Sequence, residues 1–199
     1  MPPTFRFKAD THTYFVGTRP VPAITTVLRA SGRVKEGPWF KPEHRERGKA
    51  VHLATLYFDL GLKQLVDPRW EGYFEGYVKF ARETRPRWRE LEQPRLHRKL
   101  GYAGTPDRIG FVIHGDAIVE IKTGGVSDWH AIQTAAQDIL IGGPAPGRRR
   151  LALYLPGDGE YFLREHKHST DYLKFFTDLQ KVHDGETNHD WADDDERFD

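Results

Sequence analysis

The sequence predicts a single α/β domain in which a mixed β-sheet is flanked by helices. Three patterns indicate this fold: helical apolar spacing in the first half, alternating strand-like segments in the middle, and a helix, a hairpin and a final helix in the last third. The chain has 199 residues, 38% of them hydrophobic, which is enough for one complete core. We assign residues 1–183 to a single domain and residues 184–199 to an acidic C-terminal tail, which we expect to be mobile.

The first half contains one hairpin and three helices. Residues 4–28 open with alternating apolar residues and a glycine-containing turn, which predicts a short hairpin, followed by a short helix that ends at Ser31-Gly32. Apolar residues at helical spacing then predict a helix over 44–60, which Gly61 ends, and another over 70–81.

The second half alternates strands and helices. We expect the following elements in order: a strand over 89–96, a hairpin over 104–124 that turns at His114-Gly115-Asp116, a helix over 127–141 ended by two glycines, a hairpin over 148–166 with a Pro-Gly-Asp-Gly turn, and a helix that starts at Ser169 or Thr170. The glycines at 101, 104 and 110 are expected where backbones approach closely.

The charge is unevenly distributed along the chain. The net charge is +1, but residues 184–199 contain eight acids and one arginine, a net of −7, which leaves +8 on residues 1–183. Basic clusters interleaved with aromatic residues suit a polyanionic partner such as nucleic acid; a solvated, salt-bridged surface is the alternative. The acidic tail either solvates the C-terminus or competes with DNA for the basic surface.

The absence of cysteine narrows the chemistry. Without cysteine the chain has no disulfide, no thiolate zinc site, no iron–sulfur cluster and no cysteine nucleophile, so a metal would need oxygen and imidazole ligands. The sequence also shows no apolar run of 18 residues and no signal-peptide pattern, so we expect no membrane association and a cytoplasmic location.

The hairpin over 104–124 carries charges in an otherwise apolar stretch. Glu120 and Lys122 are two residues apart on one strand and therefore share a face, while Ile121 points to the opposite face. If Asp107 faces the same side, two carboxylates and an ammonium group converge, and a hard divalent cation such as Mg²⁺ or Mn²⁺ would bridge the carboxylates. Metal and lysine together could activate a water against a phosphodiester. The alternative is a surface strand with a cross-strand Lys–Asp pair.

These motifs, taken together, resemble a known family. "GTPDRIG", then "VEIKTG", then a helix with Gln133 resembles the PD-(D/E)XK nuclease superfamily, most closely its RecB-type exonuclease branch. "RGKAVH" is similar to the "RG…H" helix of that branch, and "HTYFVG…VPAITTVL" resembles the opening of phage-encoded members and of the mitochondrial genome maintenance exonuclease. The resemblance covers roughly residues 10–140, with all motifs in the family order.

The resemblance implies a role for each matching residue. It implies a central mixed sheet flanked by helices. Asp107, Glu120 and the backbone carbonyl of Ile121 would be metal ligands, and His52 would be an additional ligand. Lys122 would be the catalytic lysine, Gln133 would orient the site, and Glu92 would be an acidic residue before the hairpin.

Several of these positions also have ordinary structural explanations. His52 could be a satisfied helix histidine, Glu92 could pair with Arg95 or Arg98, and Gln133 could be an exposed helix residue. The family usually has tyrosine four residues after its glutamine, whereas this chain has Gln137, whose role the resemblance leaves open.

The function implied is that of a DNA exonuclease, dependent on Mg²⁺ or Mn²⁺, that acts on single-stranded DNA or DNA ends in phage-type processing, recombination or repair. Candidate DNA contacts are Arg47, Lys49 and Arg148 for the backbone, and Trp39 and Tyr102 for base stacking. A structure-specific endonuclease on the same fold and a non-catalytic nucleic-acid-binding module are the alternatives. The sequence leaves open whether the protein forms a homo-oligomer or binds a recombination or replication partner. If it is phage-encoded, it would act in the bacterial host cytoplasm.

Overall fold

The computed structural model describes residues 3–35, 41–63 and 65–185. Its elements, in chain order, are β1 (Phe5–Lys8), β2 (Thr13–Val16), β3 (Arg19–Val21), α1 (Ile24–Ala30), α2 (Pro42–Asp59), the 3-10 turn η1 (Pro68–Trp70), α3 (Glu71–Thr84), β4 (Arg87–Leu91), β5 (Arg95–His97), β6 (Tyr102–Gly104), β7 (Arg108–Val112), β8 (Gly115–Lys122), α4 (Trp129–Leu140), β9 (Arg149–Tyr154), β10 (Phe162–Glu165) and α5 (Thr170–Gly185).

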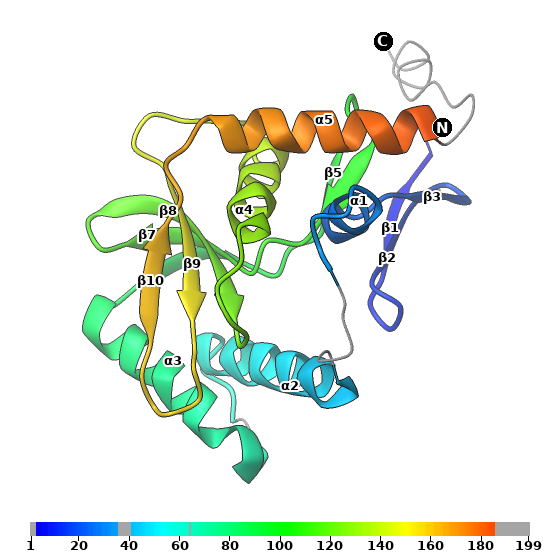
Figure 1. Ribbon diagram of the computed structural model, residues 1–199. Coiled ribbons are helices and arrows are strands. Elements are labelled where there is room, and N and C mark those ends of the chain that lie inside the picture. The colour runs from blue at the N-terminus through cyan, green and yellow to red at the C-terminus, as the bar shows by residue number, and fades with distance from the viewer. Residues whose placement is uncertain (1–2, 36–40, 64, 186–199) are drawn as a thin grey trace.

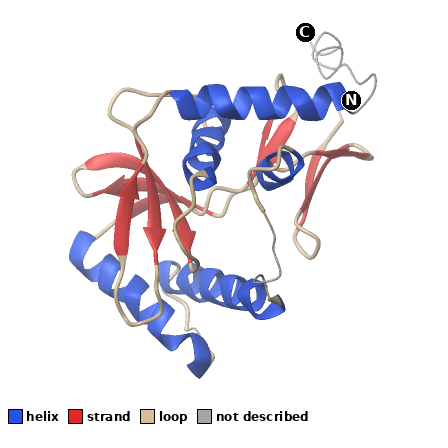
Figure 2. Ribbon diagram, viewed as in Figure 1, coloured by secondary structure: helices blue, strands red, loops and turns tan. Residues whose placement is uncertain are grey.

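A five-stranded mixed sheet lies at the centre of the protein. Its strand order is β10-β9-β8-β7-β4, in which only the β8–β9 pair is parallel. Helices α4 and α5 lie on one side of this sheet, and α2 and α3 on the other (Figures 1 and 2). The expected mixed sheet flanked by helices is therefore confirmed.

Two hydrophobic clusters hold these layers together. The first joins α2 and α3 to the sheet face that carries Val119, Ile121 and Leu153. The second joins α1, α4 and α5 around Tyr102 and Phe175. Alternation along β8 divides its residues between the two faces, so Glu120 and Lys122 lie on the face that α4 covers.

The N-terminal hairpin and the five predicted helices are present, but the strand predicted over 89–96 is wrong. Strand β4 ends at Leu91, and Arg95–His97 form β5, which pairs with β6 in a separate two-stranded sheet. The break has two causes: Glu92 has a left-handed backbone with φ 47°, and Pro94 lacks the N–H that would continue the ladder.

The hairpin of β7 and β8 is confirmed, with its turn one residue earlier than predicted. Ile113 and His114 occupy the turn with positive φ values of 45° and 66°, the combination that matches the twist of paired strands. Gly110 faces β4 so closely that an added Cβ would lie 2.3 Å from the Arg87 carbonyl oxygen. The close approach expected at this glycine is therefore confirmed.

The last two elements are also present. The hairpin of β9 and β10 is antiparallel, and α5 continues to Gly185, past the predicted domain boundary at 183. Residues 186–199 of the predicted acidic tail lie outside the described residues. Among the helices that are described, none has both the length and the apolar character needed to cross a membrane.

The "HKH" segment at 166–168 buries its first histidine: His166 is 8% exposed. Burial, with Arg150 and Arg164 nearby, lowers the pKa of His166 to about 4. Because the unfolded chain binds this proton below about pH 6.5, we expect the free energy of unfolding to fall as the pH drops from about 6.5 to 4. Urea unfolding between pH 6.5 and 4 measures this free energy, which should fall less steeply with decreasing pH in His166→Gln than in the wild type. The exposed His168→Gln should keep the wild-type slope, and equal slopes for all three proteins would contradict the prediction.

Candidate active site

The pairing of β7 with β8 brings the two predicted carboxylates together. The antiparallel ladder ends at the Arg108–Val119 pair, so Asp107 and Glu120 are the next residues along each strand. Residues directly opposite one another in an antiparallel pair share a face. A hydrogen bond from the Ile121 N–H to Asp107 Oδ2, 2.7 Å long, fixes the Asp107 carboxylate against β8. The condition that the sequence left open, that Asp107 faces the same side as Glu120, is therefore met.

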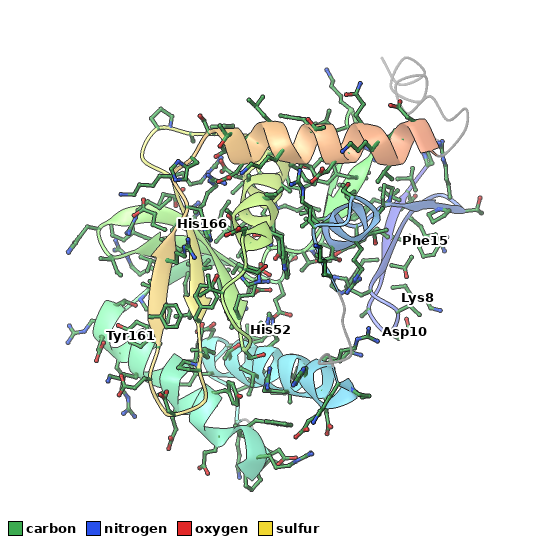
Figure 3. All side chains as sticks on the ribbon, viewed as in Figure 1. Lys8, Asp10, Phe15, His52, Tyr161 and His166 are labelled. Carbon is green, nitrogen blue, oxygen red and sulfur yellow. The ribbon has the colours of Figure 1, made fainter. Side chains whose placement is uncertain are left out.

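Two further residues meet Asp107 from other elements. His52, on α2, places its Nδ1 3.4 Å from Asp107 Oδ1. Glu92 is brought beside Asp107 by a backbone hydrogen bond of 3.0 Å from its N–H to the Asp107 carbonyl. One potential ligand atom from each of His52, Glu92 and Asp107 lies within 4.8 Å of the others. Figure 3 shows His52 on α2 near the end of the sheet.

The electrostatics of this group show an excess of negative charge. Burial raises the pKa of Glu92, and the neighbouring Asp107 raises it further. Burial would lower the pKa of His52, but Asp107 outweighs it and raises that pKa to about 9. Burial would raise the pKa of Asp107, yet His52 and the Ile121 N–H hold it below its usual value. The attraction between His52 and Asp107, which are 3.4 Å apart, therefore outweighs the effect of burial on the pKa of both groups.

Glu120 is held on the other side by a set of hydrogen bonds. Gln133 and Gln137 of α4 donate to its two oxygens at 2.7 and 2.6 Å, and Lys122 donates at 2.9 Å. Lys122 also donates to Gln133 Oε1 at 2.7 Å. Gln137, whose role the sequence left open, is thus an anchor of Glu120. Burial and Asp107 raise the pKa of Glu120, while Lys122 and Gln137 oppose the shift.

The donor set suits a hard divalent cation. Two carboxylates and one imidazole, which converge within coordination reach, are ligands that Mg²⁺ and Mn²⁺ accept, with Mn²⁺ better matched to the imidazole. A cation at this point would also relieve the repulsion that raises the pKa of Glu92 and Glu120. Glu120 stands beside this group rather than within it, since its oxygens are bound by α4 and Lys122.

Behind the site lies a buried arginine that sequence reasoning missed. Arg108 is fully buried and donates to Asp59 Oδ2 at 2.6 Å, to the Asp107 carbonyl at 2.9 Å and to Glu92 Oε1 at 3.3 Å. It also donates to Thr55 on α2, and Tyr77 bonds the same Asp59 carboxylate. Arg108 therefore ties α2, which carries His52, to the strand that follows Asp107. The signal in the sequence was an arginine on the strand face where alternation predicts an apolar residue.

A basic cleft of about 980 Å³ opens beside His52 and Lys122. Among the described residues that line it, the charged side chains are cationic or imidazole groups and none is a carboxylate. Lys122 lies 4.8 Å from the centre of the Trp129 ring, and the exposed Phe162 stacks on Tyr154 at 4.7 Å. Outside the candidate metal and catalytic residues, the basic residues that line the cleft are Arg29, Arg33, Lys35 and Arg47.

The predicted DNA contacts have mixed outcomes. Arg47 lies in the cleft, and Lys49 is exposed on the same helix. Tyr102 is wrong as a stacking residue, because it is fully buried and donates to the Ala136 carbonyl. Arg148 is wrong as a phosphate contact, because Asp138 binds it at 2.6 Å and it precedes β9 at the end of the sheet opposite Lys122. Trp39 lies outside the described residues.

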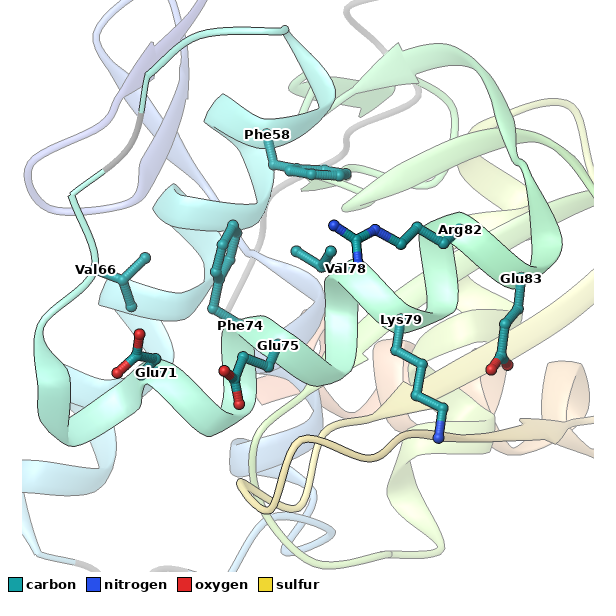
Figure 4. A pocket seen from close by; sticks show the side chains of 9 residues that line it. All are labelled: Phe58, Val66, Glu71, Phe74, Glu75, Val78, Lys79, Arg82 and Glu83. Carbon is teal, nitrogen blue, oxygen red and sulfur yellow. The ribbon is translucent and has the colours of Figure 1, made fainter.

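A second cavity, of about 830 Å³, lies between α2 and α3, and none of the candidate site residues lines it (Figure 4). Phe58, Phe74 and Val78 form its apolar part. Its charged lining is mixed, with Glu71, Glu75, Glu83, Lys79 and Arg82. This balance of charges does not suit a polyanion, so the cleft at Lys122 is the better candidate for a nucleic-acid surface.

Comparison with known proteins gives limited similarity. No protein-family model and no curated protein match the chain. Among solved structures, the chain is similar to LHK-Exo in complex with dAMP, with a TM-score of 0.40 and 15% identity over 83% of this chain and 87% of that one. It is also similar to a structure of the alkaline exonuclease LHK-Exo from Laribacter hongkongensis, with a TM-score of 0.31 and 15% identity over 82% and 89% of the two chains.

Arg108 offers a test of how the site is supported. Arg108→Met would leave Asp59 and Glu92 without their buried cation, so we expect the free energy of unfolding to fall by about 3–5 kcal/mol. Arg89→Met is the matched control, because Arg89 forms an exposed pair with Asp116 on the same sheet and should cost about 0–1 kcal/mol. Urea denaturation measures both values. Similar losses for the two variants would contradict a supporting role for Arg108.

Proposed function

We propose that this protein is a divalent-metal-dependent deoxyribonuclease of the PD-(D/E)XK type that hydrolyses phosphodiester bonds. The observation that carries the proposal is the convergence of Asp107, His52 and Glu92 beside the Glu120–Lys122–Gln133 group, at the edge of a cleft with a cationic lining. Binding alone would not require a partly buried lysine held between a carboxylate and an amide, which argues against a non-catalytic module. The sequence motifs and the exonuclease structures to which the chain is similar fit the same proposal.

Each residue of the candidate site would have a distinct role in this reaction. Asp107, Glu92 and His52 would hold Mg²⁺ or Mn²⁺, with Glu120 and the Ile121 carbonyl beside them, and the bound cation would supply Lewis-acid stabilisation of phosphate charge. Lys122, held by Glu120 and Gln133, would position the attacking water and stabilise negative charge at phosphorus. Gln137 would keep Glu120 in place.

Single-stranded DNA or a DNA end is the substrate we propose. Arg47 and Lys35 would contact phosphates along the cleft, and the exposed ring of Phe162 together with Trp129 would stack bases in place of Tyr102. A structure-specific endonuclease on the same fold is the second candidate, because the same cleft, lined by His52 and Lys122, would also accept a continuous strand.

The wider biological setting remains part of the proposal. A nuclease domain at 1–183 with an acidic tail at 184–199, action in phage-type DNA processing, recombination or repair, and a cytoplasmic location all rest on the sequence. Association with a second copy or with a recombination or replication partner also remains a prediction.

Metal binding can be measured without any assay of cleavage. Because an ion that binds only the folded state stabilises it, Mn²⁺ at about 100 times its Kd should add about 2.7 kcal/mol, or roughly 5–10 °C in Tm. Asp107→Asn should lose this shift, whereas Asp116→Asn, on the same hairpin but paired with Arg89, should keep it. A full Mn²⁺ shift in Asp107→Asn would remove Asp107 from the ligand set.

Cleavage itself tests the role of Lys122. With Mg²⁺ or Mn²⁺ and end-labelled single- and double-stranded DNA, Lys122→Ala should lose about 10²–10⁴-fold in rate, because it removes the group that positions the water. DNA affinity, measured by fluorescence anisotropy without divalent metal, should stay close to that of the wild type. Lys79→Ala, an exposed lysine on α3, is the control and should retain full activity.

The same assay separates the two nuclease candidates. An enzyme that depends on a strand end leaves circular single-stranded DNA intact, whereas cleavage of the circle would favour the endonuclease. Wild-type rates in Lys122→Ala would overturn the catalytic assignment.

A further inference from the structure

His12, the first residue of the "HTYFVG" motif, has no role in the site proposed so far, yet hydrogen bonds link it from the N-terminal hairpin to the segment that carries Asp107. His12 lies in the turn between β1 and β2, and its side chain is accessible to solvent. Its Nε2 is 3.1 Å from the Tyr14 hydroxyl, which is 2.7 Å from Thr105 Oγ1. Thr105 precedes Asp107 by two residues, so this hydrogen-bonded chain ends in the segment between β6 and β7 that carries Asp107.

The charges around His12 place it beside the same group. Burial lowers the pKa of His12, the positive charges of His52 and Lys49 add to that effect, and Asp107 opposes it. Burial also raises the pKa of Tyr14 to about 12, with contributions from Glu120 and Asp107. The hydrogen bonds that end at Thr105, two residues before Asp107, hold His12 and Tyr14 near these groups. In Figure 3 the turn that carries Asp10 points toward the side on which α2 and His52 lie.

The turn holds this ring in an uncommon backbone conformation. His12 has φ 50° and is one of five non-glycine residues with positive φ in the described part of the chain. Asparagine and glycine adopt this conformation at least as readily as histidine. The ring packs edge-on against Phe7 and Tyr14, and Thr13 bonds Thr11 within the turn, so the hairpin has other contacts that keep its shape. Asparagine at position 12 would therefore preserve the backbone while removing the imidazole.

His12 and Lys122 approach the carboxylates from different elements. Lys122 comes from β8 and has Gln133 and Trp129 of α4 around it. His12 comes from the hairpin, where the charges that act on it are those of Asp107 and of His52 and Lys49 on α2. In the hydrolysis of a phosphodiester the attacking and leaving oxygens are roughly in line, so they lie on opposite sides of phosphorus. With Lys122 on the side of the water, a donor from another element would add to the stabilisation that a bound cation supplies at the leaving oxygen.

We propose that His12 is a catalytic residue that donates a hydrogen bond to the leaving oxygen of the scissile phosphodiester. This inference rests on the nuclease function proposed above. The bond from the water oxygen to phosphorus forms and the bond from phosphorus to the leaving oxygen breaks. The proton that the water releases passes to solvent, and the leaving oxygen takes one proton from solvent. The imidazole stabilises the charge that develops on the leaving oxygen and is unchanged at the end. Tyr14 is a positioning residue, since its hydroxyl links the imidazole to Thr105.

Kinetics with a modified leaving group test this role. On ordinary DNA, His12→Asn should lower kcat by about 10²-fold with little change in KM, as expected when one donor to a developing charge is removed. With a bridging sulfur in place of the leaving oxygen, the thiolate needs little stabilisation, so the defect should shrink to below about 5-fold. Oligonucleotides with sulfur at the 3′ and at the 5′ bridging position are both assayed, and one of them should show this rescue.

Two variants serve as controls. Thr11→Ala, in the same exposed turn, should behave as wild type, and Tyr14→Phe should show a smaller loss of kcat with the same rescue. The Tm of His12→Asn should equal that of the wild type, which separates a catalytic role from a structural one. An equal defect with oxygen and both sulfur substrates, or a full rate in His12→Asn, would overturn the inference while leaving the proposed nuclease function intact.

A second measurement needs neither metal nor turnover. In EDTA, the imidazole ¹⁵N resonances of His12, assigned by their loss in His12→Asn, should shift when a short single-stranded oligonucleotide is added. Resonances that stay unchanged at saturating oligonucleotide would overturn the contact. If the wild-type protein does not cleave DNA with any divalent metal, the proposed function fails and this inference fails with it.

Discussion

The antiparallel pairing of β7 with β8 is the constraint on which the candidate site depends. Its register places Asp107 opposite Glu120, and the hydrogen bond from the Ile121 N–H to Asp107 holds one carboxylate in place. A slip of one residue would turn every side chain of one strand to the other face. The close approach of β4 at Gly110 and the apolar face packed on α2 and α3 keep this register.

The carboxylates of Glu120 and Asp107 have polar partners on different elements of the fold. The α4 glutamines and Lys122 bind Glu120, while α2 supplies His52 to Asp107. Arg108, on the opposite face of β7, links Asp59 of α2 to Glu92 and to the Asp107 backbone. Burial of several acids is tolerated because each has a donor or a cation as partner, while burial and the neighbouring Asp107 raise the pKa of Glu92 and Glu120. A divalent cation would oppose that shift.

The hairpin of β1 and β2 adds a fourth source of polar groups. It is small and forms a three-stranded sheet with β3, yet Tyr14 is fully buried beside Thr105. The hairpin therefore contributes to the environment of Asp107 as well as to the N-terminal core. This explains why chemistry proposed for a central sheet involves a segment almost one hundred residues upstream.

The sequence by itself determined the order of the elements, the helices and the hairpin over 104–124, because apolar periodicity and turn residues act over short distances. It also singled out Asp107, Glu120, Lys122, His52, Glu92 and Gln133, whose types and spacing follow from the resemblance. Only the tertiary structure decided which of them meet. It placed Glu92 within reach of Asp107 through a break in β4, and assigned Gln137 to Glu120. It buried Tyr102 and Arg108 and linked His12 to Thr105 through Tyr14, because contacts between segments far apart in the chain depend on packing that no local pattern encodes.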